Sequence, residues 1–330
     1  MRDRWTIENI PPQHGRTFIV TGTGGLGFED ALALARAGSD VIIAGRNAQK
    51  GNDAARRIKQ NVPDAVVAFE PVDLGSLESI AAFGKRLRDS RDSIDVLINN
   101  AGVMTPPRRK TTTEGFELQF GTNHLGHFAL TAHLLPLLRR GNEPRVISVS
   151  SVAARSGAIN FEDLQAERGY KPMPVYAQSK LACLMFAFEL QRRSDAHGWG
   201  ITSIAAHPGV SRTDLLHNAP GRSSLMGLIR SYMWFLFQPA AQGALPTLFA
   251  ATSPNARGGG YYGPNKLGET RGYPTDSKPP QRSLEAHVAR RLWDVSESLT
   301  GVCFGEQPRS AATLPGESAL IGSTEVRLAV

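Results

Sequence analysis

The stretch Arg16-Thr-Phe-Ile-Val-Thr-Gly-Thr-Gly-Gly-Leu-Gly27 joins a short apolar run to a cluster of glycines. The apolar residues up to Thr21 predict a buried strand, and residues 28–37 predict a helix. A strand, a glycine turn and a helix in this order place backbone N–H groups and a helix N-terminus where they can bind a pyrophosphate. Three of the glycines also satisfy the G-x-G-x-x-G pattern of dinucleotide-binding turns, namely Gly22, Gly24 and Gly27.

Apolar runs and helical stretches alternate from this turn as far as residue 206. Strands are predicted at 40–45, 65–71, 95–99, 144–150 and 201–206, and helices at 47–61, 76–90, 111–140 and 173–197. The third of these helices is expected to begin at the capping box Thr111-x-x-Glu114. This β-then-α order predicts an α/β fold, a single doubly wound parallel-sheet (Rossmann) domain with helices on both faces.

The C-terminal part of the chain is expected to complete the same domain, which spans residues 1–304. Residues 214–253 are predicted to form a helical region that covers the substrate. A last short strand is predicted within 258–264 and a helix at 283–299. Residues 305–330 are expected to form a loosely ordered tail.

Polar or small residues stand within two residues of the ends of five of the predicted strands. These residues are Gly22, Arg46, Asp73, Asn100 and Ser151. Ligands of a parallel sheet bind at the carboxyl ends of its strands, so the five positions predict one shared ligand site. Asp73 has two interpretations there: it can accept a hydrogen bond from an adenine amino group, or it can cap the helix that begins near Ser76.

The residue after the second strand bears on the choice of cofactor. In a site for NAD(H), an acidic residue here would hold the ribose 2′-hydroxyl, but this chain has Arg46 instead. An arginine suits a 2′-phosphate, and Lys50 stands one helical turn further on. The alternative is that both are solvated residues at the start of a helix. The sequence therefore favours NADP(H) over NAD(H).

A second chemical signal is the pair Tyr176 and Lys180 in Val175-Tyr-Ala-Gln-Ser-Lys180. Four residues apart on a helix, the two side chains lie on one face. An ammonium group beside a phenol favours the phenolate, so that the phenol can exchange its proton near neutral pH. Taken alone the spacing is weak evidence, because two solvated residues satisfy it equally well.

Composition and charge exclude several classes of function. The chain has 330 residues and a formal charge of +7, but its arginines are scattered and no basic run is interleaved with aromatic residues, which argues against nucleic-acid binding. Cys183 and Cys303 are far apart and form no CxxC, as expected of a reduced, cytoplasmic protein without a zinc site. His124 and His127 lack a third ligand, so we expect them to be packing or surface residues and expect no metal.

A further apolar run is Leu225-Met-Gly-Leu-Ile-Arg-Ser-Tyr-Met-Trp-Phe-Leu-Phe237. It is shorter than the roughly 20 apolar residues that a membrane span needs, and Arg230 interrupts it. A lid over an apolar substrate, a subunit contact, a peripheral membrane contact and ordinary core packing all remain open for it. The N-terminus shows no signal-peptide core, so we expect no export signal.

Together these pieces resemble the short-chain dehydrogenase/reductase family from about residue 15 to about residue 300. The matching pieces, in chain order, are the glycine turn 22–27, Asp73, Asn99-Asn-Ala-Gly102, Asn123, Ser151, Tyr176, Lys180, and Pro208-Gly209 with Thr213. Gly121-Thr-Asn-His-Leu-Gly-His-Phe128, and the long gap before Tyr176 with Asn160-Phe-Glu-Asp-Leu164 in it, are similar to the retinol dehydrogenase, WW-domain oxidoreductase and protochlorophyllide reductase-like branch. One departure is the turn from Thr21 to Gly27, which is one residue shorter than the usual T-G-x-x-x-G-x-G.

The resemblance implies an NADP(H)-dependent enzyme that interconverts a carbonyl and an alcohol on an apolar small molecule, and it suggests homo-oligomers. It implies that Ser151 hydrogen-bonds the substrate oxygen, that Tyr176 transfers the proton and that Lys180 favours the phenolate and holds the nicotinamide ribose. It also implies that Asn123 anchors a water that relays protons. The cofactor contacts that it implies are Gly22, Thr23, Gly25, Leu26, Gly27, Arg46, Asn47, Lys50, Asp73, Leu74, Asn100, Ala101, Gly102, Tyr176, Lys180, Pro208, Gly209, Val210 and Thr213.

Two other functions compete with this one. The first is a non-catalytic NADP sensor or scaffold on the same fold, for which the shortened glycine turn is the only support. The complete set of Ser151, Tyr176, Lys180 and Asn123 argues against it, because a sensor has no need of all four. The second is a nucleotide-sugar epimerase or dehydratase, which the compact C-terminal part disfavours.

Overall fold

The computed structural model describes residues 4–211 and 238–305, and in them one sheet of eight strands has the order β3-β2-β1-β4-β5-β6-β7-β8. The strands are β1 (Thr17–Thr21), β2 (Asp40–Gly45), β3 (Val67–Pro71), β4 (Val96–Asn99), β5 (Arg145–Val149), β6 (Thr202–Ala206), β7 (Tyr261–Lys266) and β8 (Arg271–Asp276). Every neighbouring pair is parallel except β7 and β8, which are antiparallel. The predicted α/β fold, with its doubly wound parallel sheet, is confirmed.

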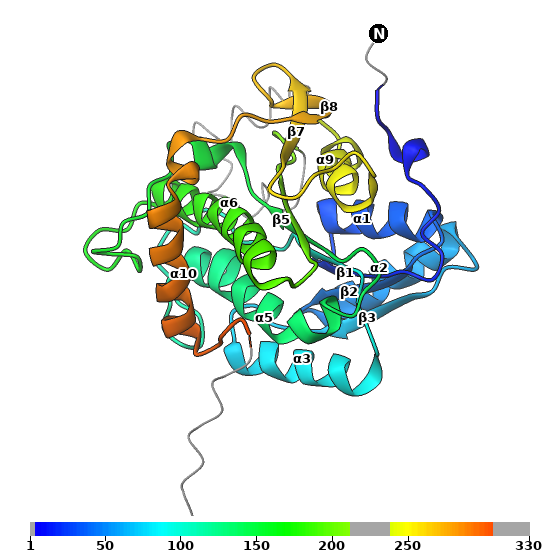
Figure 1. Ribbon diagram of the computed structural model, residues 1–330, viewed down its shortest axis with the longest axis horizontal. Helices are drawn as coiled ribbons and strands as arrows, with labels where there is room; N and C mark the ends of the chain where they lie inside the picture. The colour runs from blue at the N-terminus through cyan, green and yellow to red at the C-terminus, as the bar shows by residue number, and fades with distance from the viewer. Residues whose placement is uncertain (1–3, 212–237, 306–330) are drawn as a thin grey trace, which may run out of the picture.

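Helices cover both faces of this sheet (Figure 1). The longer ones are α1 (Gly25–Arg36), α2 (Ala48–Asn61), α3 (Leu77–Ser90), α5 (Gly126–Leu138), α6 (Pro172–His197), α9 (Ala240–Thr252) and α10 (Ala286–Thr300). Short helical turns are η1 (Ile7–Asn9), α4 (Leu118–Phe120), η2 (Gly121–Leu125), η3 (Val152–Ser156) and η5 (Gln281–Leu284). Buried residues of α1, α2 and α9 join one large core cluster, whereas those of α3 and α5 join a second on the opposite face, together with Phe186 and Leu190 of α6.

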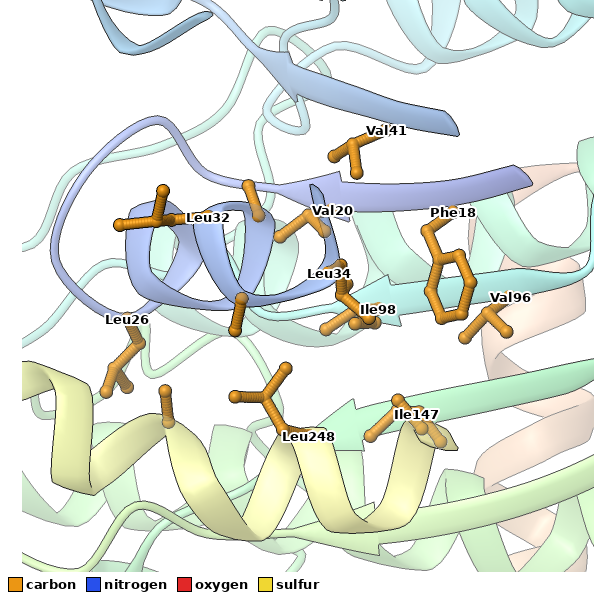
Figure 2. Packing of buried hydrophobic residues seen from close by; sticks show 14 of the residues in the cluster. Phe18, Val20, Leu26, Leu32, Leu34, Val41, Val96, Ile98, Ile147 and Leu248 are labelled. Atoms are coloured by element: carbon orange, nitrogen blue, oxygen red, sulfur yellow. The ribbon is translucent and has the colours of Figure 1, made fainter. Parts of the chain in front are cut away.

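The central strand β1 shows why the predicted strands are continuous apolar runs. Phe18 and Val20 pack into the cluster under α1 and α9, and Ile19 between them packs into the cluster on the opposite face. All three side chains are fully buried. A parallel strand covered by helices on both sides buries every side chain, so apolar residues do not alternate with polar ones. In Figure 2, the side chains of Phe18 and Val20 lie on the side of the sheet on which Leu248 of α9 packs.

The expected capping box at Thr111 and Glu114 is wrong. The helix begins only at Leu118, where the Glu117 side chain accepts a hydrogen bond from the Phe120 N–H at 2.7 Å. Glu114 instead accepts a hydrogen bond from the Leu77 N–H at 2.6 Å, so it caps the first turn of α3. The expected long helix is also divided, because the wider π-helical turn η2 lies between α4 and α5.

The C-terminal part contains one strand that the sequence did not predict. β8 includes Gly272 and Pro274, two residue types that are rare inside strands. Within the segment 214–253 that was predicted to cover the substrate, residues 240–252 form α9, which packs against α1. Residues 214–237 of that segment, which include the apolar run 225–237, and residues 306–330 of the expected tail lie outside the described residues. Among the helices of the described residues, none is long and apolar enough to cross a membrane.

Candidate active site

The turn that follows β4 is fixed to the end of β1. The Thr21 hydroxyl accepts hydrogen bonds from the backbone N–H groups of Asn100 and Ala101, both at 2.9 Å. The Asn100 side-chain amide donates to the Thr21 carbonyl at 2.7 Å. These bonds bring the predicted cofactor residues Asn100 and Ala101 against the start of the glycine turn. Sequence reasoning did not assign Thr21 a role, although its position at the end of the strand before the glycines is a usable signal.

The glycine turn leaves no room for a side chain at its first and last residues, Gly22 and Gly27. Gly22 has a φ of +102°, and a Cβ at Gly27 would lie 2.5 Å from the Gly22 carbonyl oxygen and 2.7 Å from the Asn100 amide nitrogen. Gly24 precedes the first turn of α1 and has no side chain that could cap it. The first N–H groups of α1 are therefore left for an anion, as a bound pyrophosphate requires. These residues fit the phosphates of a dinucleotide.

The end of β2 carries the cationic part of the candidate site. Arg46 and Lys50 are both exposed at the start of α2. Asn47 between them caps this helix, because its side chain accepts the Lys50 N–H at 2.9 Å. A Cβ at Gly45 would lie 2.9 Å from the Thr23 methyl carbon, so the shortened glycine turn packs against the end of β2, beside Arg46.

After β3, the question of what Asp73 does is partly answered. Ser76, rather than Asp73, is the N-cap of α3, and its side chain accepts the Ser79 N–H at 3.2 Å. Asp73 accepts the Gly75 N–H at 2.9 Å through Oδ1. Leu74, which was also predicted to contact the cofactor, has a buried side chain in the core.

Lys180 lies where β4, β5 and α6 meet. Its ammonium group donates a hydrogen bond to the Val149 carbonyl at 2.9 Å, and the side chain is only 5% exposed. A Cβ at Gly102 would lie 3.5 Å from the Lys180 nitrogen and 3.0 Å from Asn123 Oδ1. The fold thus brings Gly102, Asn123 and Lys180 together from distant parts of the chain. Tyr176, one helical turn before Lys180, is buried as well.

Ser151 is the N-cap of the short helix η3, and the residues just before and just after η3 both contact α6. The Ser151 hydroxyl accepts the Ala153 N–H at 3.2 Å. Just before it, the Ser150 hydroxyl donates to the Lys180 carbonyl at 2.7 Å. At the other end of η3, a Cβ at Gly157 would lie 2.5 Å from the carbonyl oxygen of Ala177, the residue after Tyr176. The segment that carries Ser151 therefore packs against the turns of α6 that carry Tyr176 and Lys180.

Asn123 explains why a polar side chain stands within this helical stretch. Its Oδ1 accepts the Val103 N–H at 2.7 Å, and its Nδ2 donates to the Val103 carbonyl at 3.0 Å and to the Ser179 hydroxyl at 2.9 Å. The side chain therefore holds the backbone that follows Gly102. Its role as an anchor for a relay water stays a prediction.

Two neighbouring histidines are buried structural groups, and the packing interpretation is confirmed for both. Burial, with the nearby Lys180 charge, lowers the pKa of His127 to about 4 despite the hydrogen bond to Asn123. The neutral His127 ring donates a hydrogen bond from Nδ1 to the Asn123 carbonyl at 3.0 Å. Its Nε2 therefore accepts a hydrogen bond from the Thr21 hydroxyl, also at 3.0 Å. Burial likewise lowers the pKa of His124 to about 3, and this ring bonds Ser296 of α10 at 2.8 Å.

The loop after β6 carries the last predicted cofactor residues. The Val210 N–H donates to the Thr270 carbonyl at 2.8 Å, and the Gln238 amide donates to the Pro208 carbonyl at 2.6 Å. Gly209 has a φ of +65°. Pro208, Gly209 and Val210 thus extend from the carboxyl end of β6, beside β5 and Ser151. Thr213 lies outside the described residues.

Comparisons with known proteins place this geometry in a family. Residues 16–222 match the family model described as short chain dehydrogenase. The chain is 37% identical to retinol dehydrogenase 14 of Mus musculus over 302 residues, which cover 88% of this chain and 87% of the mouse protein. It is 38% identical to polyprenol dehydrogenase of Homo sapiens over 299 residues, or 89% and 87% of the two chains.

A solved structure agrees with this result. The crystal structure of an uncharacterized protein from Mycobacterium Paratuberculosis superimposes with a TM-score of 0.77 at 38% identity. The match covers 92% of this chain and the whole of the other. The similarity therefore extends over nearly the full domain, including the segments that carry Ser151, Tyr176 and Lys180.

Proposed function

Because this chain belongs to the short-chain dehydrogenase family, we propose that it is an NADP(H)-dependent oxidoreductase that interconverts an alcohol and a carbonyl on an apolar small molecule. The observation that carries the proposal is the buried meeting of Gly102, Asn123 and Lys180, with Tyr176 one turn away on α6. Gly102 has no side chain, so a flat ligand can lie close to its backbone, and the buried ammonium group of Lys180 can donate hydrogen bonds to the hydroxyls of a ribose.

The side chains would divide the work in the following way. The Ser151 hydroxyl donates a hydrogen bond to the substrate oxygen, and the Tyr176 hydroxyl gives its proton to that oxygen during reduction or takes it during oxidation. Lys180 places its ammonium group on the same helix one turn from Tyr176 and binds the ribose hydroxyls. Asn123 keeps Gly102 and Val103 in place and anchors the relay water. The bound nicotinamide supplies or accepts the hydride.

The preference for NADP(H) rests on the end of β2. Arg46 and Lys50 are exposed beside the glycine turn, and the carboxylate that would hold a free ribose 2′-hydroxyl is not present at either position. A 2′-phosphate would form charge-assisted hydrogen bonds with the guanidinium group of Arg46. The Asn47 cap sets where α2 begins and so where both cations emerge.

An apolar substrate is supported by two observations. Met173 lies three residues before Tyr176 on α6, hence on the same side of the helix, and it is 44% exposed despite its apolar side chain. Two relatives are named for apolar alcohols, retinol and polyprenol. An exposed methionine beside the reacting group is a suitable contact for such a chain.

The test is turnover by the purified protein with a panel of aldehydes and ketones that runs from small to long and apolar. We expect NADPH to be consumed and Tyr176→Phe to lower kcat by a factor of roughly 10² to 10⁴, because the proton donor is lost. NADPH binding, followed by fluorescence, should be retained. The matched control is Tyr273→Phe, a tyrosine of β8 whose ring lies against Arg4.

Two results would count against this assignment. Undiminished turnover by Tyr176→Phe would contradict the role of the tyrosine. A wild-type protein that binds NADPH tightly but reduces nothing in the panel would favour the sensor or scaffold, for which the shortened glycine turn is the supporting feature.

A further inference from the structure

A single carboxylate in the turn between β7 and β8 links three segments around the candidate active site. Glu269 forms an ion pair of 2.7 Å with Arg155 of η3, the helix that begins after Ser151. Arg155 also donates to the Gly268 carbonyl at 2.9 Å. The hairpin turn is thereby attached to the segment that carries the catalytic hydroxyl, more than a hundred residues away in the sequence.

The same carboxylate reaches the loop after β6. Glu269 Oε2 lies 3.0 Å from Nε2 of His207, a side chain that is fully buried. The other ring nitrogen of His207 accepts the Gly209 N–H at 3.2 Å, so the neutral ring carries its proton on Nε2 and donates it toward Glu269. Burial lowers the pKa of His207, which keeps the ring neutral near pH 7.

The carboxylate is held in its charged form. Burial opposes ionisation, but hydrogen bonds from His207, Ser277 and the Lys278 N–H outweigh it and lower the pKa of Glu269 to about 2. At any pH where the protein would be assayed, Glu269 is therefore an anion facing the cationic Arg155 and the donor of His207.

The backbone at this position is strained, and the contacts account for it. Leu267 and Glu269 have φ values of +48° and +65°, in the left-handed region of backbone conformation that residues other than glycine rarely adopt. Thr270, next in the chain, accepts the Val210 N–H at 2.8 Å. A Cβ at Gly209 would lie only 2.3 Å from the Thr270 carbonyl oxygen, so the hairpin turn and the loop 207–210 are in close contact.

We propose that Glu269, through Arg155 and His207, is a positioning residue that sets the loop 207–210 relative to Ser151 and thereby places the nicotinamide end of the cofactor against the reacting groups. This inference rests on the proposed function and on the expectation that Pro208, Gly209 and Val210 contact the cofactor, which we assign to its carboxamide end. Glu269 contacts neither the substrate nor the nicotinamide in this proposal. It acts by fixing the loop 207–210 and the Ser151 segment, between which the nicotinamide and the substrate oxygen meet. Small displacements of such segments have large effects on rate.

The experiment separates the two ends of the cofactor with two probes. NADPH contains the nicotinamide, whereas adenosine 2′,5′-bisphosphate contains only the adenosine end. For Glu269→Gln, we expect the dissociation constant for NADPH to rise about tenfold, or roughly 1.4 kcal/mol, and kcat to fall. Binding of adenosine 2′,5′-bisphosphate should change by less than twofold. A role confined to general stability would weaken both probes together.

The matched control is Asp276→Asn in the neighbouring strand. Asp276 pairs with Arg257 at 3.4 Å, and both side chains are largely exposed, so this ion pair is of the same kind but does not include Glu269, Arg155 or His207. We expect this variant to bind both probes like the wild type. Arg155 provides a second route if Glu269→Gln folds poorly: its side chain is 44% exposed, so Arg155→Met should fold and should reproduce the selective loss, while Arg155→Lys should restore part of the binding.

The outcomes are distinct. A selective loss of NADPH binding and kcat in Glu269→Gln or Arg155→Met supports the positioning role. Equal losses for both probes, or wild-type values for both, overturn it while leaving the enzyme assignment intact. A wild-type protein that binds neither probe refutes the proposed function itself, and the positioning role with it.

Discussion

At the end of β2, the polar side chains of the candidate site point into solvent, whereas at the ends of β5 and β6 they are buried and bonded. Arg46 and Lys50 are exposed, but Lys180 is 5% exposed and His207 is fully buried. The adenosine half of the proposed site thus consists of bare backbone and surface cations. In the nicotinamide half, Ser151, Asn123 and Lys180 each take part in hydrogen bonds within the protein before any ligand arrives.

The difference indicates which property each half controls. Exposed cations attract an anionic phosphate but are screened by salt, so they contribute affinity and choice of cofactor. Buried, hydrogen-bonded side chains hold their positions and contribute to rate through preorganisation. Substitutions in the adenosine half should therefore change mainly binding constants, whereas those in the nicotinamide half should lower kcat, with or without a change in NADPH affinity.

In the adenosine half, the largest loss of cofactor affinity is expected from a substitution in the glycine turn, Gly27→Ala. The added carbon would lie 2.5 Å from the Gly22 carbonyl, a backbone atom that cannot move aside without opening the turn. We expect NADPH and adenosine 2′,5′-bisphosphate to bind at least ~100-fold more weakly, because the phosphates share this turn. Isothermal titration with both ligands provides the measurement.

Gly169→Ala is the control for this substitution. No atom lies within 4 Å of a Cβ at Gly169, so this variant should bind like the wild type. Near-normal affinity in Gly27→Ala would show that the shortened turn does not contact the phosphates, and the proposed division of the site would have to be redrawn.

A smaller and more selective effect is expected at Arg46. Arg46→Ala should raise the dissociation constant for NADPH about tenfold and leave that for NADH nearly unchanged, because only the 2′-phosphate would pair with the guanidinium group. The loss should shrink as salt is raised, since the wild-type contact is exposed and screened. Lys85→Ala, which removes a cation from an exposed pair with Asp89 on α3, is the control. Tighter binding of NADH than NADPH by the wild type would reverse the cofactor assignment.

The same contrast explains how far the sequence could predict the structure. The strands around the site were predicted because each is a buried apolar run followed by a helix, a signal contained within a few neighbouring residues. The glycine turn and the Tyr176–Lys180 spacing are local signals of the same kind. The cap formed by Glu114 was mispredicted because its partner, Leu77, lies 37 residues away.

The supporting groups of the nicotinamide half were hidden for the same reason. Glu269 meets His207 across 62 residues, and Asn123 meets Ser179 across 56. The pair His124–Ser296 spans 172 residues. Such contacts exist only once the sheet has brought the segments together, and an isolated glutamate in a hairpin turn carries no local pattern that would identify its partners.

The last prediction concerns α1, the helix behind the glycine turn, and it should leave the cofactor site unchanged. Asp30 is fully buried, and within the described residues neither carboxylate oxygen has a hydrogen-bond partner. Burial raises the pKa of Asp30 well above its ordinary value. The folded state then retains a proton that the unfolded chain releases above about pH 4, so this group destabilises the fold as the pH rises toward its folded pKa.

Asp30→Asn removes that titration while nearly preserving the shape of the side chain. We expect the variant to be more stable than the wild type near pH 8, by roughly 1 kcal/mol or more, and to lose less stability between pH 5 and pH 8. Denaturant unfolding at several pH values would measure this, with NADPH affinity unchanged within twofold. The same substitution at Asp95, whose oxygens accept the Thr17 and Asn142 N–H groups at 2.6 Å each, should be destabilising instead. If Asp30→Asn is less stable than the wild type, the Asp30 carboxylate accepts a hydrogen bond in the folded protein. In that case this side chain helps to hold α1, the helix behind the glycine turn.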